Sequence, residues 1–320
     1  MIGWTLLALV VVLVLFVLLS PLESLQWWVA KGEREVAETF DVVAPEPGLR
    51  TPARHYIVYL SGVGTIGGDE LSGREEAWLQ SLRDELPEAR VVGDVFPYAV
   101  DNRGLRQRAT VWLWGRLHRW RRKGRALFLP FIIELRNIAQ VLVSADPRYG
   151  PTYNIGLAQE LWRSLQRQGY VPGSGAPVTL VGFSGGAQVA LGAGWYLSGL
   201  GVPVTVISVG GIFGDDPGLD RVRHLWHLSG SRDKLQHLGT VAFPGRWPTA
   251  PLSPWAKAKR EGRVTTLDVG PMEHSGANGY LGRRAVGEDG RNHAEVTRDV
   301  VIRIVRGWTS PGVRGGPSST

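Results

Sequence analysis

Short, almost continuously apolar runs alternate along the middle of the chain with longer amphipathic stretches. The apolar runs have the length and β-branched composition of strands that are buried on both faces. They lie at residues 56–60, 90–95, 178–182, 204–209, 223–228 and 264–269. The stretches typical of helices lie at residues 74–85, 155–168, 185–199 and 295–308. This alternation predicts an α/β fold, with a doubly wound and mostly parallel sheet, over residues 55–308.

The two ends of the chain do not follow this alternation. Residues 2–19 carry no charge, and as a helix they would rise about 27 Å, close to the hydrocarbon thickness of a bilayer. No Lys or Arg precedes the run and no A-x-A-like site follows it, which favours a single-pass transmembrane anchor at 1–20 over a cleaved signal peptide. Residues 21–54 are then a juxtamembrane linker of mixed charge, so the side of the membrane stays open. Residues 309–320 are rich in Ser, Gly and Pro and are predicted to be a disordered tail.

A long interval separates the second predicted strand from the third, and it is far longer than an ordinary crossover. We expect a helical cap insertion over about residues 104–154. The apolar residues between Ala109 and Trp120 share one face of a basic helix. Residues 126–143 are apolar, but Pro130 and several polar side chains favour a packed cap helix over a second membrane span. The basic segment 104–125 is also a candidate for contact with an anionic membrane surface.

Composition narrows the classes of chemistry. Of 320 residues, 43% are hydrophobic and 20% charged, which excludes disorder for most of the chain. The absence of cysteine excludes disulfides, thiolate metal sites and a cysteine nucleophile. The formal net charge is +7, but residues 104–125 hold eight Lys and Arg and no acidic residue, and the rest of the chain has 28 basic and 29 acidic residues. The positive charge is therefore a local patch, and we expect no nucleic-acid partner.

The most informative segment joins the third predicted strand to a helix of small residues through the motif G-x-S-x-G. Gly182, Ser184 and Gly186 carry it. A serine on so sharp a turn has a strained backbone, which is accommodated only where the residues two before and two after it lack bulky side chains. The turn lifts the Ser184 hydroxyl above the sheet and places the Gly185 amide at a helix N-terminus, where it can stabilise an oxyanion. The motif predicts a serine nucleophile, and an incidental serine in a glycine-rich turn is the alternative.

With this motif the sequence resembles the α/β-hydrolase superfamily of serine hydrolases, over roughly residues 56–308. The resemblance implies a catalytic triad in the chain order serine, acid, histidine, and a second oxyanion amide after an early strand. Asp233 stands in the turn S-G-S-R-D after a predicted strand, as the family's acid does. Asp215 and Asp216, which follow the preceding strand, are the alternatives, although their neighbouring Pro and Gly also suit a structural turn.

Two histidines are candidates for the base. His274 follows the last predicted strand and is similar to the family's histidine loop, whereas His293 lies just before the final helix. We favour His274, because a short loop at a strand end holds a side chain more tightly than a long glycine-rich loop. For the second oxyanion amide the resemblance implies Val63. The family commonly has histidine before the glycine of that loop, and here the residue is Ser61.

Other patterns compete with this interpretation. Gly62, Gly64 and Gly67 spell the dinucleotide fingerprint G-x-G-x-x-G after a strand, with Asp94 as the ribose acid. Two acidic residues at positions 69 and 70 would place negative charge where a pyrophosphate should lie, which weighs against this alternative.

The pair H-x-x-H formed by His224 and His227 looks like a metal site. A spacing of three along a strand sends the two side chains to opposite faces, so we expect no metal there.

Together the residues predict a membrane-anchored serine hydrolase that uses neither metal nor cofactor. Ser184 attacks an acyl carbonyl, His274 takes its proton, Asp233 orients the imidazole, and the amides of Val63 and Gly185 hold the oxyanion. The anchor, the cap and the basic patch favour a lipid-like acyl substrate, while the leaving group stays open. A non-catalytic, membrane-tethered binding or scaffold protein on the same frame is the rival interpretation.

Overall fold

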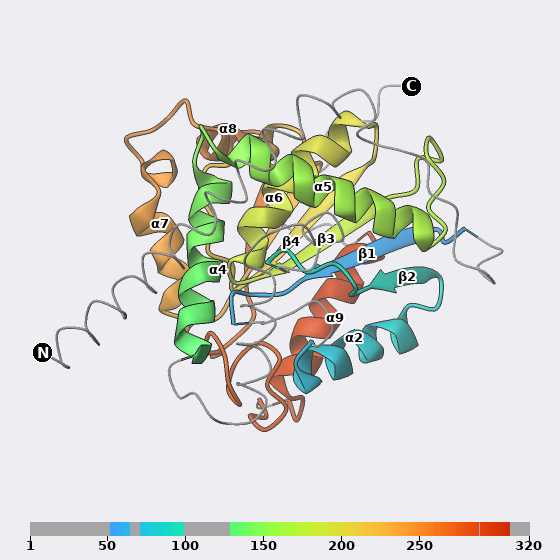
Figure 1. Cartoon of the computed structure of the whole chain (residues 1–320). Helices are drawn as coiled ribbons and strands as arrows, with labels where there is room; N and C mark the ends of the chain where they lie inside the picture. Colours follow the sequence, from blue (N-terminus) through green and yellow to red (C-terminus); the bar gives the residue numbers. More distant parts are fainter. Residues whose placement is uncertain (1–51, 65–70, 99–128, 288, 308–320) are drawn as a thin grey trace, which may run out of the picture.

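A six-stranded parallel sheet with helices on both faces forms the centre of the computed structural model, which describes residues 52–64, 71–98, 129–287 and 289–307 (Figure 1). The strand order is β2-β1-β3-β4-β5-β6. The strands are β1 (His55–Leu60), β2 (Ala89–Val92), β3 (Val178–Phe183), β4 (Val204–Val209), β5 (His224–Ser229) and β6 (Val264–Asp268). The longer helices are α2 (Gly73–Glu85), α4 (Leu129–Ala145), α5 (Gly150–Arg167), α6 (Gly186–Gly199) and α9 (His293–Val305). Shorter helical segments are η2 (Pro217–Asp220), η3 (Leu235–His237), α7 (Leu238–Ala242), η4 (Pro244–Arg246) and α8 (Pro254–Arg260).

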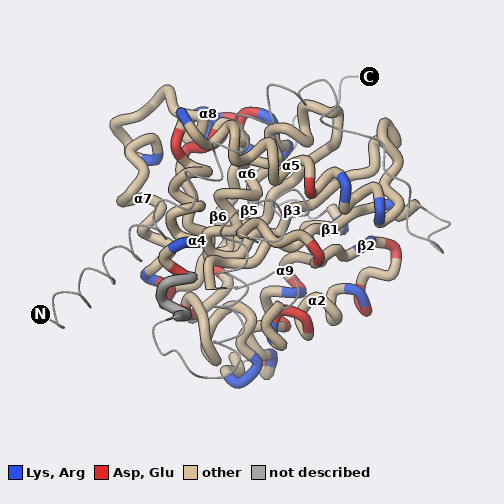
Figure 2. Tube along the Cα trace, in the orientation of Figure 1, with Lys and Arg blue, Asp and Glu red and all other residues tan. Residues whose placement is uncertain are grey.

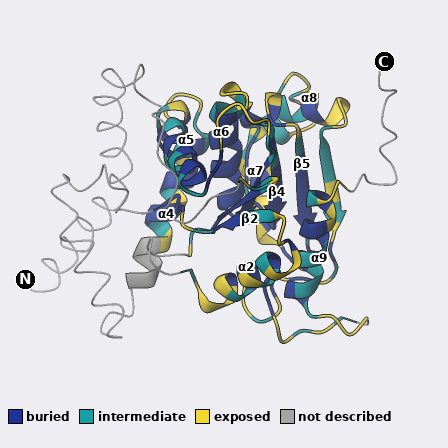
Figure 3. Ribbon diagram, turned by 90° about the vertical axis from the view of Figure 1, so that its right-hand side faces the viewer, coloured by how far each residue is buried: buried dark blue, intermediate teal, exposed yellow. Residues whose placement is uncertain are grey.

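Each face of the sheet has its own hydrophobic core, and this explains why the inner strands are mostly apolar. In β1, the side chains of Tyr56, Val58 and Leu60 join the core under α5 and α6, while those of Ile57 and Tyr59 join the core under α2 and α9. A strand that is covered on both sides has no solvent-facing position, so its sequence shows no alternation. Figure 3 shows the inner strands and α6 buried, with exposed residues on the outer surfaces of the helices. The predicted α/β class and parallel sheet are confirmed.

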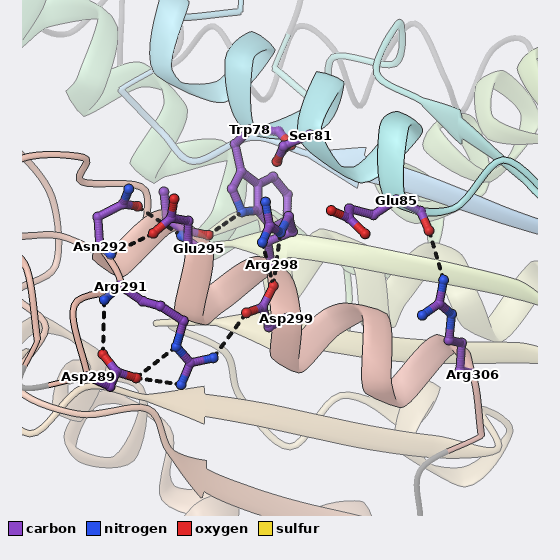
Figure 4. Close-up of polar contacts among 11 residues, drawn as sticks. Trp78, Ser81, Glu85, Asp289, Arg291, Asn292, Glu295, Arg298, Asp299 and Arg306 are labelled. Atoms are coloured by element: carbon purple, nitrogen blue, oxygen red, sulfur yellow. Dashed lines mark hydrogen bonds and ion pairs between the residues drawn. The ribbon is translucent and has the colours of Figure 1, made fainter.

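Two sets of hydrogen bonds, one from α2 and one from the N-terminal cap of α9, hold the chain where it enters α9. The Trp78 indole donates a hydrogen bond to the carbonyl of Ala294 (3.1 Å), in the first turn of α9. Asn292 caps α9 by accepting from the amide of Glu295, and the Glu295 carboxylate accepts in return from the amide of Asn292 (Figure 4). Such a reciprocal cap satisfies two amides that would otherwise lack partners. The C-terminal end of the long loop between β6 and α9 is therefore firmly held.

Helix α4 carries polar side chains that point into the protein. Arg136, Asn137 and Gln140 are all buried, and α4 packs against α5 and α6. Of the segment predicted as a cap helix at 126–143, residues 129–143 are helical, and the contacts of α4 with α5 and α6 are contacts with protein. Helix α5 begins at Gly150, five residues before the start of the helix predicted at 155–168.

Several predictions concern residues outside the described ranges. These are the anchor at 1–20, most of the linker at 21–54, the basic segment 104–125 and the tail at 309–320. Among the described residues, no helix has both the length and the hydropathy needed to cross a bilayer. Around the described part, Lys and Arg are interspersed with Asp and Glu (Figure 2).

Candidate active site

One edge of the sheet brings together the loops that carry the candidate residues. Because all neighbouring strands are parallel, their carboxyl ends meet at the same edge, where open α/β sheets bind ligands. Val63 follows β1, Ser184 follows β3, Asp233 follows β5, and His274 follows β6. Residues that are far apart in the sequence thus come from loops at a common edge.

Ser184 has the strained backbone that the motif predicts. Its φ is +54°, and it is the only non-glycine residue with positive φ in the described part of the chain. A Cβ on Gly182 would lie 2.5 Å from the Ala187 nitrogen, and one on Gly186 would lie 2.4 Å from the Leu60 carbonyl oxygen. Backbone atoms cannot yield to such contacts, so both positions require glycine. Strain of this kind persists only where the surrounding structure enforces it.

The three side chains expected to form a triad are hydrogen-bonded in series. Nε2 of His274 lies 2.8 Å from the Ser184 hydroxyl, and Nδ1 of His274 lies 2.9 Å from Oδ2 of Asp233. Ser184 and Asp233 are buried, and the His274 side chain is 13% exposed. With a proton on Nδ1, the imidazole donates to the carboxylate and accepts from the serine, which is the arrangement that a general base needs.

Asp233 is held by donors other than the histidine. Its Oδ1 accepts from the amides of Leu235 (2.9 Å) and Gln236 (3.3 Å), and its Oδ2 accepts from the Tyr280 hydroxyl (2.9 Å). The Tyr280 hydroxyl in turn accepts from the amide of Gly230 (2.8 Å). These bonds fix the carboxylate in the plane that it presents to the imidazole.

The same contacts keep Asp233 ionised. Burial by itself raises the pKa of a carboxyl group, but the hydrogen bonds and charge from His274 and the bond from Tyr280 outweigh it, so the pKa of Asp233 lies below its usual value. Burial and the nearby Asp233 charge raise the pKa of Tyr280 far above that of free tyrosine. Tyr280 therefore remains a neutral donor to an anionic acceptor.

The alternative acids and base lie in other environments. His293 lies in the first turn of α9, and its Nδ1 is 2.8 Å from the Asn278 carbonyl oxygen. The Asp216 carboxylate accepts from Gln188 and from the amide of Gly218. Burial raises the pKa of Asp216 to about 7. Asp215 lies against Gly245. Neither aspartate is hydrogen-bonded to His274, so the series from Ser184 runs through His274 to Asp233.

In the described part of the chain, two backbone amides near Ser184 are free to donate a hydrogen bond to a ligand oxygen. Within the described residues, the amides of Val63 and Gly185 donate no hydrogen bond. The Nδ2 of Asn137, on α4, donates to the Val63 carbonyl (2.7 Å) and so holds this loop in place. A Cβ on Gly62 would lie 3.1 Å from Cβ of Ser184, which shows how closely the loop approaches the serine. The Ser61 hydroxyl is buried and has no partner in the described structure, so it does not replace a histidine's hydrogen bond there.

Three side chains support the site without having been predicted. Tyr280 holds Asp233, Asn137 holds the loop of Val63, and the ring of Phe183 stacks on His274 with centroids 5.6 Å apart. Phe183 stands inside the G-x-S-x-G motif, so its closeness was accessible from the sequence. Tyr280 and Asn137 belong to no motif, and they contact the site only because the fold brings distant parts of the chain together.

The dinucleotide alternative finds little support. The loop of Gly62 and Gly64 lies against the serine turn, and Gly67 lies outside the described residues. The Asp94 carboxylate is bonded to the Ser164 hydroxyl at 2.7 Å. Asp94 lines a hollow of about 570 Å³ at the open edge of β2. None of the triad residues lines this hollow, so it is separate from the candidate active site.

The two histidines of the H-x-x-H pair have separate hydrogen-bond partners on different strands. Nε2 of His224 is 2.9 Å from the Thr265 hydroxyl on β6, whereas Nδ1 of His227 is 3.0 Å from the Ser208 hydroxyl on β4. In the described part of the chain, no three His, Asp or Glu side chains gather to hold a metal ion.

His227 makes the stability of the protein sensitive to acid. Burial lowers the pKa of this histidine to about 4, while an unfolded chain takes up a proton near pH 6.5. Stability is thus fully present above about pH 6.5 and is lost as the pH falls toward 4, by about 3 kcal/mol. We expect His227→Asn, which retains a partner for Ser208, to lose less stability over this range than the wild type, as measured by urea unfolding at a series of pH values. Parallel curves for the two proteins would refute this assignment.

Comparisons with known proteins give a faint resemblance. No protein-family model matches the chain, and no curated protein matches its sequence. Among solved structures, the chain is similar to the crystal structure of a dienelactone hydrolase-like promiscuous phosphotriesterase from metagenomic libraries. The identity is 13%, the match covers 82% of this chain and 88% of that chain, and the TM-score is 0.44. The parallel sheet, with a strained G-x-S-x-G turn after an inner strand, fits an α/β-hydrolase-like fold.

Proposed function

We propose that this protein is a serine hydrolase that cleaves acyl esters through an acyl-enzyme on Ser184. The observation that carries the proposal is the unbroken hydrogen-bond series from Ser184 through His274 to Asp233. A serine hydroxyl is a poor nucleophile at neutral pH unless a base accepts its proton, and a base is most effective when a third group orients it. The serine, the base and the orienting group all lie at the carboxyl edge of one sheet.

The mechanism follows from the position of each group. The Ser184 oxygen attacks the acyl carbonyl carbon, its proton passes to Nε2 of His274, and the carbonyl π electrons move onto oxygen. The amides of Val63 and Gly185 donate to that oxyanion. The C=O bond then re-forms, the bond from the carbonyl carbon to the alcohol oxygen breaks, and the imidazolium, stabilised by Asp233, gives its proton to that leaving oxygen. Water then attacks the acyl-enzyme by the same route and releases the acid.

We further propose that the acyl group is lipid-like and that residues 2–19 anchor the protein to a membrane. Exposed apolar side chains lie on α4, at Ile138 and Leu142, and on α7, at Leu238 and Val241. Helix α7 follows the turn of Asp233 in the chain. The neighbouring α4 residue Asn137 contacts the loop of Val63. Exposed apolar groups beside a site are suited to contact with a long hydrocarbon chain.

Labelling with an alkyl fluorophosphonate tests the serine hydrolase. The folded full-length protein should take up one equivalent, and peptide mass spectrometry should place the adduct on Ser184, because only a base-activated serine reacts rapidly. The unfolded protein is the control and should stay unlabelled. A folded protein that takes up no label would favour the non-catalytic scaffold. An adduct on another serine, such as Ser208, would refute the assignment of the nucleophile.

The same reagent tests the lipid-like substrate. Labelling should become faster as the alkyl chain is lengthened and when anionic vesicles are added. Equal rates for short and long chains, with and without vesicles, would eliminate the lipid part of the proposal while leaving the hydrolase intact.

A further inference from the structure

Tyr98 carries a buried hydroxyl that the fold does not use. The residue lies six positions beyond the end of β2, its side chain is 5% exposed, and its hydroxyl has no hydrogen-bond partner in the described structure. Buried polar groups in native proteins are nearly always paired, because losing water without gaining a partner costs stability. A bound molecule that reaches this hydroxyl would supply the partner that the described residues do not.

The hydroxyl lies beside the glycine that follows the nucleophile. A Cβ built on Gly185 would lie 3.2 Å from the Tyr98 hydroxyl oxygen, 3.0 Å from Cγ1 of Val63 and 2.7 Å from Cγ2 of Val141. The segment after β2, the loop after β1 and α4 thus converge on Gly185. Two of the residues at this point, Val63 and Gly185, also have backbone amides without acceptors in the described structure. Three donors without acceptors are therefore grouped beside Ser184.

The backbone around Tyr98 is held from both sides. The Tyr153 hydroxyl, from α5, donates to the Pro97 carbonyl oxygen (2.7 Å). The buried guanidinium of Arg136, from α4, donates to the Tyr98 carbonyl oxygen (2.9 Å). A donor fixed in advance by its supporting contacts needs little reorganisation when charge develops near it.

The hydroxyl also stays protonated at any working pH. Burial, with a smaller contribution from Tyr153, raises the pKa of Tyr98 far above the usual value for tyrosine. Tyr98 is therefore suited to donate a hydrogen bond and not to act as a base.

We propose that the Tyr98 hydroxyl is a third oxyanion donor, which hydrogen-bonds the substrate carbonyl oxygen together with the amides of Val63 and Gly185. This role rests on the hydrolase function proposed above. When the Ser184 oxygen bonds to the carbonyl carbon, the π electrons move to the carbonyl oxygen and the serine proton goes to His274. Tyr98 keeps its own proton throughout and donates it in a hydrogen bond to the carbonyl oxygen. The hydrogen bond strengthens as negative charge accumulates, so its contribution is larger in the transition state than in the bound substrate.

The conservative variant Tyr98→Phe tests this role without removing the ring. We expect kcat for an acyl ester to fall about 10- to 100-fold with little change in KM. The rate of fluorophosphonate labelling should fall in parallel, because the phosphonyl oxygen occupies the same place. The melting temperature should stay equal to that of the wild type or rise, since the hydroxyl has no partner to lose.

Tyr56→Phe is the matched control. Tyr56 is a buried tyrosine of β1 whose hydroxyl accepts from the amide of Ala53 (3.1 Å). This variant should lower the melting temperature and leave kcat near the wild-type value.

The outcomes separate the two proposals. Wild-type kcat and labelling in Tyr98→Phe would overturn the donor role alone, and so would a loss of activity matched by a loss of melting temperature. A wild-type protein that is folded yet neither hydrolyses esters nor takes up the label would overturn the hydrolase and the donor together.

Discussion

Replacing His274 by alanine is expected to lower kcat for an acyl ester by roughly 10⁶-fold, as the loss of the base in a serine triad does. The reason is geometric: Nε2 of His274 is the ring nitrogen that lies 2.8 Å from the Ser184 hydroxyl. Without it the serine proton has no acceptor. The measurement is steady-state hydrolysis of a chromogenic ester, with the melting temperature as the check on folding. Ser184→Ala should cause a similar loss, and the double variant should be no worse than either single variant, because the two residues act as one unit.

His293→Ala is the matched control for this prediction. His293 is buried at the start of α9 and is hydrogen-bonded to the Asn278 carbonyl. Its removal should therefore lower the melting temperature while leaving kcat near the wild-type value. If His293→Ala were inactive and well folded while His274→Ala kept its activity, the two histidines would have to exchange roles.

The sheet could be predicted because the apolar pattern of each strand lies within the strand's own sequence. Five strands begin and end within about one residue of their predicted limits. Four of them, β1, β3, β4 and β5, are apolar runs buried on two faces, which are visible in the sequence alone. The exception is β2, predicted to reach residue 95 but ending at Val92. It is an edge strand, and its length is set by the four pairs that it makes with β1. Pairing of this kind depends on a distant strand and leaves no pattern in the segment itself.

The helices differ from prediction at the start of α5 and in the two short helices α7 and α8. Pro151 lies in the first turn of α5, where proline is favoured because its missing N–H would have no partner there. The helix predicted at 155–168 begins only after this proline, whereas α5 already includes it. Helices α7 and α8 have five and seven residues, which is too short for an apolar periodicity to be seen.

The candidate site divides in the same way. The turn at Ser184 could be predicted because its steric demands fall on residues two positions away in either direction. The choice between Asp233 and Asp216, or between His274 and His293, depends on contacts across 41 and 90 residues of chain, from Asp233 to His274 and from Ser184 to His274. Tyr98 was invisible for a related reason, because a hydroxyl without a partner can be recognised only once every neighbour has been placed.

Asp233→Asn is expected to lower kcat by about 10⁴-fold while the protein stays folded, because the amide enforces the wrong imidazole tautomer. Oδ1 of Asp233 accepts from the amides of Leu235 and Gln236, so the asparagine oxygen must take that place. Its NH₂ group then replaces Oδ2 and faces Nδ1 of His274, which must give up its proton to accept. The proton moves to Nε2, which then donates to Ser184 when it should accept from it.

Asp216→Asn makes the matched comparison, since Asp216 is the acid that sequence alone leaves open. Its carboxylate is bonded to Gln188 and Gly218 and not to the imidazole, so this variant should keep kcat near the wild-type value. Burial raises the pKa of Asp216 to about 7, so the two variants are compared above pH 7, where both carboxyl groups are largely ionised. A general effect of net charge on substrate binding would then appear in both variants. Ester hydrolysis and thermal melts of the two proteins, measured side by side, therefore isolate the contact with His274. An Asp216→Asn protein as inactive as Asp233→Asn would mean that a buried carboxylate anywhere behind this edge of the sheet is what the reaction needs, and the assigned triad would lose its acid.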